Sequence, residues 1–362
     1  MNDETPKKHF WTKLRNWIKT HRTRTYIIAG AVLVVIAGIV AYVVLAQKSP
    51  QIFPQIIKVA PKPKPVVYYS PLTGEVVPDE ATTKQAVTGI MIENSPDARP
   101  QSGIKDAGIV YEAIAEGGIT RFLALYQQEK PALIGPVRSV RLYYVDWVAP
   151  YNASVAHIGG SKFALDEVRN GKYRDIDQFF NAGSYWRASD RYAPHNVYTS
   201  FERLDALNRA KGYTESAFIA FPRVDGKASV KPDATSVAIN ISSALYNTAY
   251  TYDPATNKYN RQLAGVPHTD REKGQITPDV VIAMKVNMSL VMEDGYRESI
   301  TTNGSGEANI FQNGIVQTVT WHKADRASQI TFTDAAGKEV PLVRGQTWIT
   351  AVPNGGGSVS WK

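Results

Sequence analysis

The pattern of hydrophobic and polar positions separates a membrane-type segment from a longer globular part. Residues 26–45 read YIIAGAVLVVIAGIVAYVVL, without one charged side chain. A helix of this length spans about 30 Å, the thickness of a bilayer core. We therefore predict one transmembrane helix. A cleaved signal peptide, with small residues at 44–46, is the alternative, but its apolar core is usually only about 7–15 residues long.

Strands and helices alternate in the next part of the chain. Apolar runs at 89–94 and 154–159 predict strands, and those at 109–115 and 119–127 predict a hairpin turned by Glu116-Gly117-Gly118. Helical spacing predicts helices at 139–149 and 162–169, and a third from a capping box, Thr199 to Glu202, to Gly212. This alternation indicates an α/β (or α+β) ectodomain over residues 70–225.

The pattern changes after Pro222, where strand-type runs follow one another without helices between them. The predicted strands are residues 236–241, 248–252, 258–262 and 280–291. Turn signals at Asn313-Gly314 and at 335–337 indicate further hairpins. We predict a smaller, mostly antiparallel β domain over residues 230–362.

The distribution of charge changes the meaning of the net +8. Residues 1–70 hold eleven Lys and Arg against two acidic residues, whereas the rest holds 30 basic and 31 acidic residues. A body near neutrality argues against a nucleic-acid partner. The cations of the 1–25 tail place it in the cytoplasm and the bulk of the chain outside the plasma membrane. Residues 46–69, rich in Pro and Lys, predict an extended linker.

The first candidate for chemistry is Arg121 in the second strand of the hairpin. Glu116 lies beside it at the turn, and Glu112 lies on its partner strand. Alternation places Arg121 on the same face as Ile119 and Leu123, where an unpaired charge is costly. Arg121 therefore lines a polar cleft or forms a pair with a carboxylate that fixes the register of the strands, and the pattern leaves both open.

The second candidate lies at the expected start of the helix at 139–149. A helix N-terminus favours an anion, and Arg138 and Arg141 would add guanidinium groups suited to carboxylate or phosphate, beside Ser139. Alternatively Ser139 caps the helix, and both arginines pair with Asp146 or other acids. Both interpretations stay open.

The third candidate is the string His157-Ile158-Gly159-Gly160-Ser161 and the long loop that comes after the next helix. Gly159 and Gly160 would let a ligand approach the backbone, and Ser161 would cap the helix or face the ligand. The loop at 178–198 is too aromatic to be disordered. Its aromatic rings would stack on a sugar or plug an interface, and they are Tyr185, Trp186 and Tyr192. Its polar candidates are Arg187, Asp190, Arg191, His195 and Asn196.

Several strings, in this order, resemble the YerB-like family of extracytoplasmic proteins of Gram-positive bacteria. They are GIMIEN, ARPQSG, IVYEAIAEGGITRF, IGPVRSVR, HIGGS, RYAPHNVYT, NGIVQTVTWHK and GQTWI, between about residues 71 and 353. The resemblance implies two extracytoplasmic domains and carries no assigned activity. Family members look like lipoproteins held by an acylated cysteine, whereas this chain has no cysteine and a transmembrane segment in that place.

Two functions follow as hypotheses. In the first, a cleft lined by arginine and histidine binds an anionic wall component, either peptidoglycan or another polymer. In the second, the chain is an envelope glycan or peptide hydrolase or lyase with Glu112, Glu116, His157 and His195 as acid–base candidates. The histidines lack metal-ligand spacing, so neither a metal nor another cofactor is predicted. The membrane and the wall are the predicted partners, and the sequence points to no particular protein partner.

Overall fold

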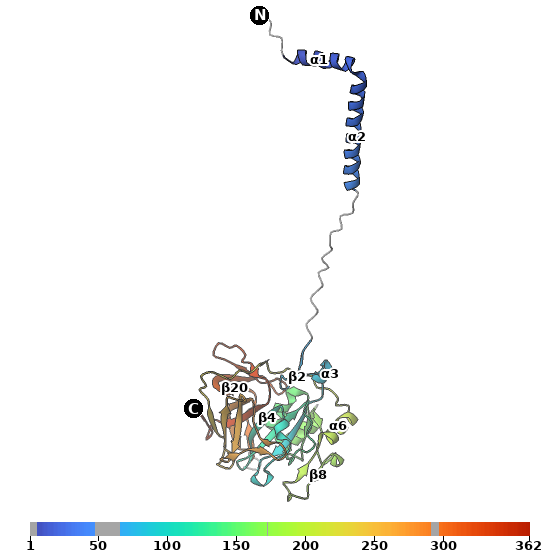
Figure 1. Ribbon diagram of the computed structural model, residues 1–362. Helices are drawn as coiled ribbons and strands as arrows, with labels where there is room; N and C mark the ends of the chain where they lie inside the picture. Colours follow the sequence, from blue (N-terminus) through green and yellow to red (C-terminus); the bar gives the residue numbers. More distant parts are fainter. Residues whose placement is uncertain (1–5, 48–65, 172, 291–296) are drawn as a thin grey trace. The chain divides into compact units, whose positions relative to one another are not determined.

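The computed structural model describes residues 6–47, 66–171, 173–290 and 297–362. They fall into two compact units, residues 1–64 and 65–362, which are described separately (Figure 1). Most of the predicted linker, residues 48–65, lies outside the described residues, as does position 291 of the strand predicted at 280–291.

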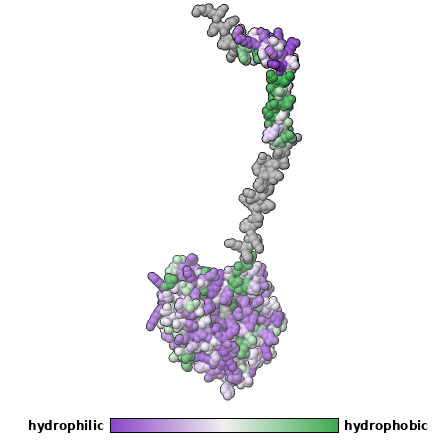
Figure 2. Space-filling model, in the orientation of Figure 1, coloured by the Kyte–Doolittle hydropathy of each residue, from purple (hydrophilic) through white to green (hydrophobic). Residues whose placement is uncertain are grey.

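The described residues of the first unit form two helices, α1 (Pro6–Thr20) and α2 (Arg22–Gln47). The predicted transmembrane segment lies within α2, which has no buried residue. Figure 2 shows the face of α2 that is in view as mostly hydrophobic. Its length and composition suffice to cross a membrane, and a signal sequence would meet the same criterion.

A large mixed sheet forms the centre of the second unit. Within the described residues it has ten strands in the order β22-β21-β20-β17-β24-β4-β5-β3-β6-β7. The first half of the chain contributes β3 (Thr88–Glu93), β4 (Ile109–Glu116), β5 (Ile119–Tyr126), β6 (Ser154–Ala156) and β7 (Arg174–Asp175). The second half contributes β17 (Val280–Val286), β20 (Gly304–Gln312), β21 (Ile315–Lys323), β22 (Thr331–Thr333) and β24 (Thr347–Pro353).

The predicted hairpin is confirmed as β4 and β5, turned at Gly117 and Gly118 with positive φ angles of 57° and 77°. The strands of this hairpin are buried on both faces, which explains why they read as continuous apolar runs. Helices α4 (Leu142–Val148) and α5 (Lys162–Asn170) contribute to the core on one face. Helix α6 (Phe201–Ala210) contributes to the core on the other face.

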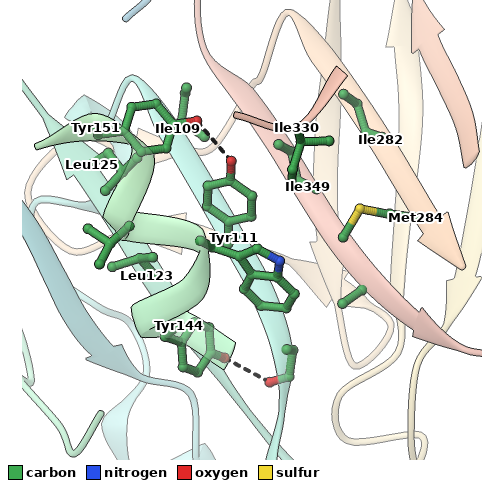
Figure 3. Packing of buried hydrophobic residues seen from close by; sticks show 14 of the residues in the cluster. Ile109, Tyr111, Leu123, Leu125, Tyr144, Tyr151, Ile282, Met284, Ile330 and Ile349 are labelled. Carbon is green, nitrogen blue, oxygen red and sulfur yellow. Dashed lines mark hydrogen bonds between the residues drawn. The ribbon is translucent and has the colours of Figure 1, made fainter. Parts of the chain in front are cut away.

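Figure 3 shows the first of these cores between the central strands and the segment that includes α4. The Tyr111 and Tyr151 hydroxyls lie 2.8 Å apart, and the Tyr144 hydroxyl donates to the carbonyl of Ala113 at 3.1 Å. These bonds satisfy the polar ends of large buried rings, as buried tyrosines require. The centre of the sheet is thereby a rigid platform for the loops at its edges.

A second, antiparallel sheet in the order β14-β13-β12-β11-β25 characterises the later part of the chain. It buries Tyr250, Tyr252 and Tyr259 against Val281 and Phe311 of the large sheet. Its strands are β11 (Ser236–Asn240), β12 (Thr248–Asp253), β13 (Lys258–Leu263), β14 (Val266–Pro267) and β25 (Ser358–Trp361). The structure therefore has the predicted fold class, an α/β part and a smaller antiparallel β part behind an N-terminal helix.

Short elements complete the second unit. They are β1 (Tyr68–Tyr69), β2 (Val76–Val77), α3 (Glu80–Thr83), β8 (Trp186–Arg187), β9 (Val197–Tyr198), β10 (Arg223–Val224), β15 (Thr269–Asp270), β16 (Gly274–Gln275), β18 (Met288–Leu290), β19 (Glu298–Ile300) and β23 (Leu342–Val343). Single 3₁₀ turns occur at η1 (Pro96–Ala98), η2 (Ile104–Asp106), η3 (Ala149–Tyr151) and η4 (Ala182–Ser184).

Two predicted helix starts were wrong. Helix α4 begins at Leu142 and not at Ser139, because Arg141 is extended and the N–H groups of Arg138 and Val140 donate to the carbonyls of Met91 and Gly159. Helix α6 is capped by Ser200, whose hydroxyl accepts from the N–H of Arg203 at 3.3 Å. The predicted cap, Thr199, donates its hydroxyl to the carbonyl of Ser184 instead.

Candidate functional site

Glu116, at the end of β4, forms ion pairs with two of the candidate arginines. Its Oε1 lies 2.5 Å from Arg121 Nη2, and its Oε2 lies 2.5 Å from Arg141 Nη2 and 3.0 Å from Arg141 Nε. Arg121 also donates to the carbonyl of Ser139 at 2.9 Å. The interpretation of Arg121 as a paired arginine is therefore the one that the geometry supports.

These pairings determine the charge of the group. Burial raises the pKa of Glu116, but Arg121 and Arg141 outweigh it and hold the pKa below its ordinary value. The carboxylate is ionised at neutral pH and is poorly suited to donate a proton. Arg141 pairs with Glu116 and not with Asp146, which binds Arg326. A site for an anion at the helix start is not formed, since Arg141 is extended and paired with Glu116, and α4 has only seven residues.

Glu112, a second acid–base candidate, lies on the opposite face of the sheet in a closed network. Its Oε2 accepts from Arg261 Nη2 at 2.8 Å, and both side chains are fully buried. Arg261 Nε donates to His268 Nδ1 at 2.9 Å, and His268 Nε2 therefore donates to Gln101 Oε1 at 2.9 Å. Burial lowers the pKa of His268 far below its ordinary value, and Arg261 lowers it further. This network connects the two halves of the second unit, and all of its side chains are buried.

His157, a third candidate, is also buried. Its Nδ1 lies 2.8 Å from the carbonyl oxygen of Gly159, and its Nε2 lies 3.0 Å from Asp175 Oδ1. Asp177 accepts from the N–H of Gly159 at 3.2 Å and from Arg169 at 2.8 Å. The bonds to its ring nitrogens fix the loop after β6, so the geometry gives His157 a structural role.

The two glycines of this string are explained by packing. A Cβ at Gly160 would stand 2.8 Å from Val140 Cγ1 and 3.0 Å from the carbonyl oxygen of Val140. Gly159 has a φ of +62°, a conformation that glycine adopts without strain. Ser161 precedes α5 without a side-chain capping bond, and Ser139 donates to the carbonyl of Ile158 at 2.9 Å. The expected approach of a ligand to these glycines is not needed to explain them.

A different cluster forms where β3 ends, and we call Glu93, Ser95, Arg138 and His195 the Glu93 cluster. Glu93 Oε1 lies 2.9 Å from His195 Nδ1, 2.9 Å from Ser95 Oγ and 3.1 Å from Arg138 Nε. Its side chain is only 4% exposed, and Oε2 is buried without a hydrogen-bond partner. Two of the predicted ligand-binding residues, Arg138 and His195, thus meet at Glu93, which was not among the predicted site residues.

The Glu93 cluster adjoins an open cleft of about 710 Å³, which we call the His195 cleft. Its lining residues are Asp97, Pro100, Asp190, Arg191, Tyr192, Ala193, His195 and Arg271. Arg191 donates to the carbonyls of Asp97 and Pro100 at 3.1 and 2.5 Å, which fixes its guanidinium at the wall. Arg271 binds Asp190 at 2.5 Å, and the Tyr192 side chain is 93% exposed.

Four of the predicted residues line the cleft, namely His195, Asp190, Arg191 and Tyr192. Arg187 and Asn196 lie in the same loop, where Arg187 Nη1 donates to Asn196 Oδ1 at 2.7 Å and Asn196 fixes the loop backbone. In the described part of the chain no group of three or more acidic or histidine side chains suits a metal ion.

The missed residues are Glu93, Ser95, Asp97 and Arg271. The first three had a local signal, since an ionisable residue ends a buried apolar strand and a Pro-containing turn follows it. Arg271 belongs to the second half of the chain and reaches the cleft only through the tertiary fold, so no local pattern could select it.

The comparisons with known proteins agree with this architecture. The model of the "Protein of unknown function (DUF3048) N-terminal domain" matches residues 72–214, and that of its C-terminal domain matches residues 237–349. The "Putative lipoprotein YerB" of Bacillus subtilis (strain 168) is 32% identical over 290 residues, which cover 79% of this chain and 86% of that protein. The crystal structure of the YerB protein from Bacillus subtilis superposes with a TM-score of 0.72 at 30% identity, over 81% of this chain and 99% of that chain. The chain belongs to the YerB-like family and contains both DUF3048 domains.

Proposed function

We propose that this chain is a membrane-anchored extracytoplasmic protein that binds a carboxylate-bearing component of the cell envelope, such as peptidoglycan, in the His195 cleft. The observation that carries the proposal is the meeting of two guanidinium groups and an imidazole in one open cleft of about 710 Å³. Arg191 and Arg271 replace Arg121, Arg138 and Arg141 as ligand-binding arginines, because they line the cleft, whereas Glu116 and Glu93 bind the other three outside its lining.

The chemistry of the cleft fits such a ligand. Guanidinium groups bind carboxylates through paired, charge-assisted hydrogen bonds. The backbone carbonyls that hold Arg191 reduce the entropy lost when it engages a ligand. Asp97 and Asp190 keep the cleft from being strongly positive, which favours a ligand with dispersed carboxylates and hydroxyls over a dense polyanion.

The test is co-sedimentation of residues 66–362, which form the second unit, with purified peptidoglycan sacculi. The double variant Arg191→Gln with Arg271→Gln is expected to bind at least about tenfold more weakly, a loss of about 1.4 kcal/mol or more. Arg209→Gln, at an exposed position on α6, is the matched control and should bind as the parent does. Equal binding by the double variant, or none by the parent, would contradict the proposal.

We also propose a single-pass topology in the plasma membrane, with a cytoplasmic N-terminus. The positive charges before α2 and the apolar length of α2 support it. Because the chain has no cysteine, single cysteines can report the side of the membrane. A membrane-impermeant maleimide should label Lys231→Cys in intact cells and Asn16→Cys only after lysis. The reverse pattern, or release of a shortened chain from the membrane, would refute the topology.

One observation favours a second candidate function, acid–base catalysis by His195. A carboxylate only accepts, so Glu93 holds a proton on Nδ1 and leaves Nε2 of the neutral ring as the acceptor. His195 lines the cleft, where Nε2 lies 3.9 Å from Asp97 Oδ2. A carboxylate that orients an imidazole in this way is typical of a general base.

Incubation of sacculi with the protein distinguishes the two functions. A hydrolase or lyase should release soluble fragments, detected by mass spectrometry, and His195→Gln should abolish the release while Glu93→Gln reduces it. Binding without released fragments, with and without added divalent metal, would leave the binding function alone.

A further inference from the structure

The His195 cleft has a neighbour that shares part of its wall. This second hollow, here the Trp186 hollow, has a volume of about 370 Å³. Asp190 and Arg271 line both, so the two hollows meet at the Asp190–Arg271 ion pair. Trp186, Arg187, Tyr198 and Glu272 are among the residues found only in the Trp186 hollow.

The ion pair between the hollows is a weak barrier. Its side chains are 50% and 38% exposed, and exposed ion pairs contribute little to stability, about 0–1 kcal/mol. A ligand with its own hydroxyl or carboxylate groups can therefore accept from Arg271 or donate to Asp190 in place of the partner. The same two side chains would then contact a ligand at the point where it passes from one hollow to the other.

The sizes of the hollows indicate how much ligand each accepts. Sites for one small ligand usually measure about 300–1,000 Å³. At about 710 and 370 Å³ each hollow is large enough for a unit of its own. A chain that fills both hollows loses its translational freedom only once, so contacts in the second hollow increase the affinity.

We propose that the two hollows form one continuous groove for a linear glycan with carboxylate substituents, which crosses the Asp190–Arg271 pair. The inference rests on the proposed binding function and names the ligand as a strand with at least one disaccharide unit on each side of that pair. Each hollow contains an aromatic side chain together with charged groups at its rim, Tyr192 in one and Trp186 in the other.

The side chains favour a glycan over a peptide. The Tyr192 ring is 93% exposed, and the guanidinium of Arg203 lies 4.7 Å from the centre of the Trp186 ring, which helps to hold it in place. Rings with accessible faces stack on other flat or apolar surfaces, while carboxylates and guanidinium groups bond to hydroxyls and carboxylates. The lining has one large aliphatic side chain, Leu133, so it offers little of the apolar surface that anchors a peptide.

The test uses the full chain in nanodiscs and peptidoglycan glycans stripped of stem peptides, whose lactyl groups carry free carboxylates. Isothermal titration compares the disaccharide with the tetrasaccharide and the hexasaccharide. The tetrasaccharide is expected to bind at least about tenfold more tightly than the disaccharide. In Ser189→Trp, a bulky ring at an exposed lining position fills the Trp186 hollow, and this difference should vanish while disaccharide affinity stays within about twofold.

The matched control is Ala255→Trp, at an exposed position that lines neither hollow, which should keep the full length dependence. Equal affinity for all three glycans would overturn the groove while leaving the binding function intact. The choice of a glycan would be overturned if the protein bound no glycan but bound linear stem-peptide oligomers more tightly with increasing length, and if Ser189→Trp blocked that binding. Failure of the parent to bind either these probes or whole sacculi would instead contradict the proposed function itself.

Discussion

At the scale of single residues, carboxylates decide which arginines are available to a ligand. Glu116 binds Arg121 and Arg141, and Glu93 binds Arg138. The predicted hairpin places Glu116 near Arg121, but the carboxylates that bind Arg138 and Arg141 come from other strands, so the sequence could not assign these two acceptors. The loop residues His195 and Arg191 remain available to a ligand, because their own hydrogen bonds position them at the wall of the cleft.

The Glu116 group gives a stability prediction. Glu116→Gln removes the charge between two guanidinium groups whose side chains are almost buried, at 3% and 7% exposure. Loss of one partner from a buried ion pair costs about 3–5 kcal/mol, and we expect a loss in this range for residues 66–362 in urea unfolding. Glu80→Gln removes an exposed i,i+4 pair with Lys84 and should leave the midpoint nearly unchanged. Similar midpoints for both variants would refute the role of Glu116.

His268 predicts a dependence of stability on pH. Its pKa in the folded protein lies well below the ordinary value because of burial and the nearby Arg261. Below about pH 6.5 the unfolded chain takes up a proton that the folded chain does not, so stability falls as pH falls. Each pH unit costs up to about 1.4 kcal/mol from this residue.

Urea unfolding at several pH values between 5 and 6.5 measures this contribution. His268→Gln should reduce the slope of unfolding free energy against pH by up to about 1.4 kcal/mol per unit. His322→Gln, which alters a partly exposed ring bonded to Thr333, is the control and should keep the parent slope. If His268→Gln showed the same slope as the parent protein, this imidazole would not bind a proton on unfolding.

At the scale of elements, local patterns predicted strands and hairpins well and helix starts poorly. The β4–β5 hairpin was predictable because the apolar runs and the Gly117-Gly118 turn are contiguous in sequence. The start of α4 was not, because the N–H groups of Arg138 and Val140 bond to Met91 and Gly159, which are distant in sequence. The same non-local pairing brings Arg138 to Glu93, so the local signal at the end of β3 could not show which side chains Glu93 binds.

Gly160 tests whether the Gly-Gly string serves packing or a ligand. Gly160→Ala places a Cβ against Val140 where the extended segment before α4 pairs with the residues after β6. Overpacking of this kind costs about 1–3 kcal/mol, measured by thermal or urea unfolding. Gly183→Ala meets nothing within 4 Å and should change stability by less than about 0.5 kcal/mol. An unchanged stability with lost sacculus binding in Gly160→Ala would favour the ligand interpretation instead.

At the scale of the whole molecule, the two family regions share one sheet. Strand β24 lies between β4 and β17 and runs parallel to both. Trp348 and Ile349 of β24 are buried in the cores on the two faces of the sheet. The sequence predicted the change from an α/β to a β pattern, but it could not show that a strand near the C-terminus completes the first region, because that pairing spans more than 200 positions.

This shared sheet predicts that the two regions unfold together. Without β24, the edge of β4 would be unpaired, and apolar side chains of both cores would be exposed. Residues 66–362 should therefore show one transition in which far-ultraviolet circular dichroism and tryptophan fluorescence coincide. A fragment of residues 66–225 should lack a cooperative transition, whereas removal of residues 1–64 should not affect it. Two separate transitions, or cooperative unfolding of the 66–225 fragment, would show that the regions fold independently despite their common sheet.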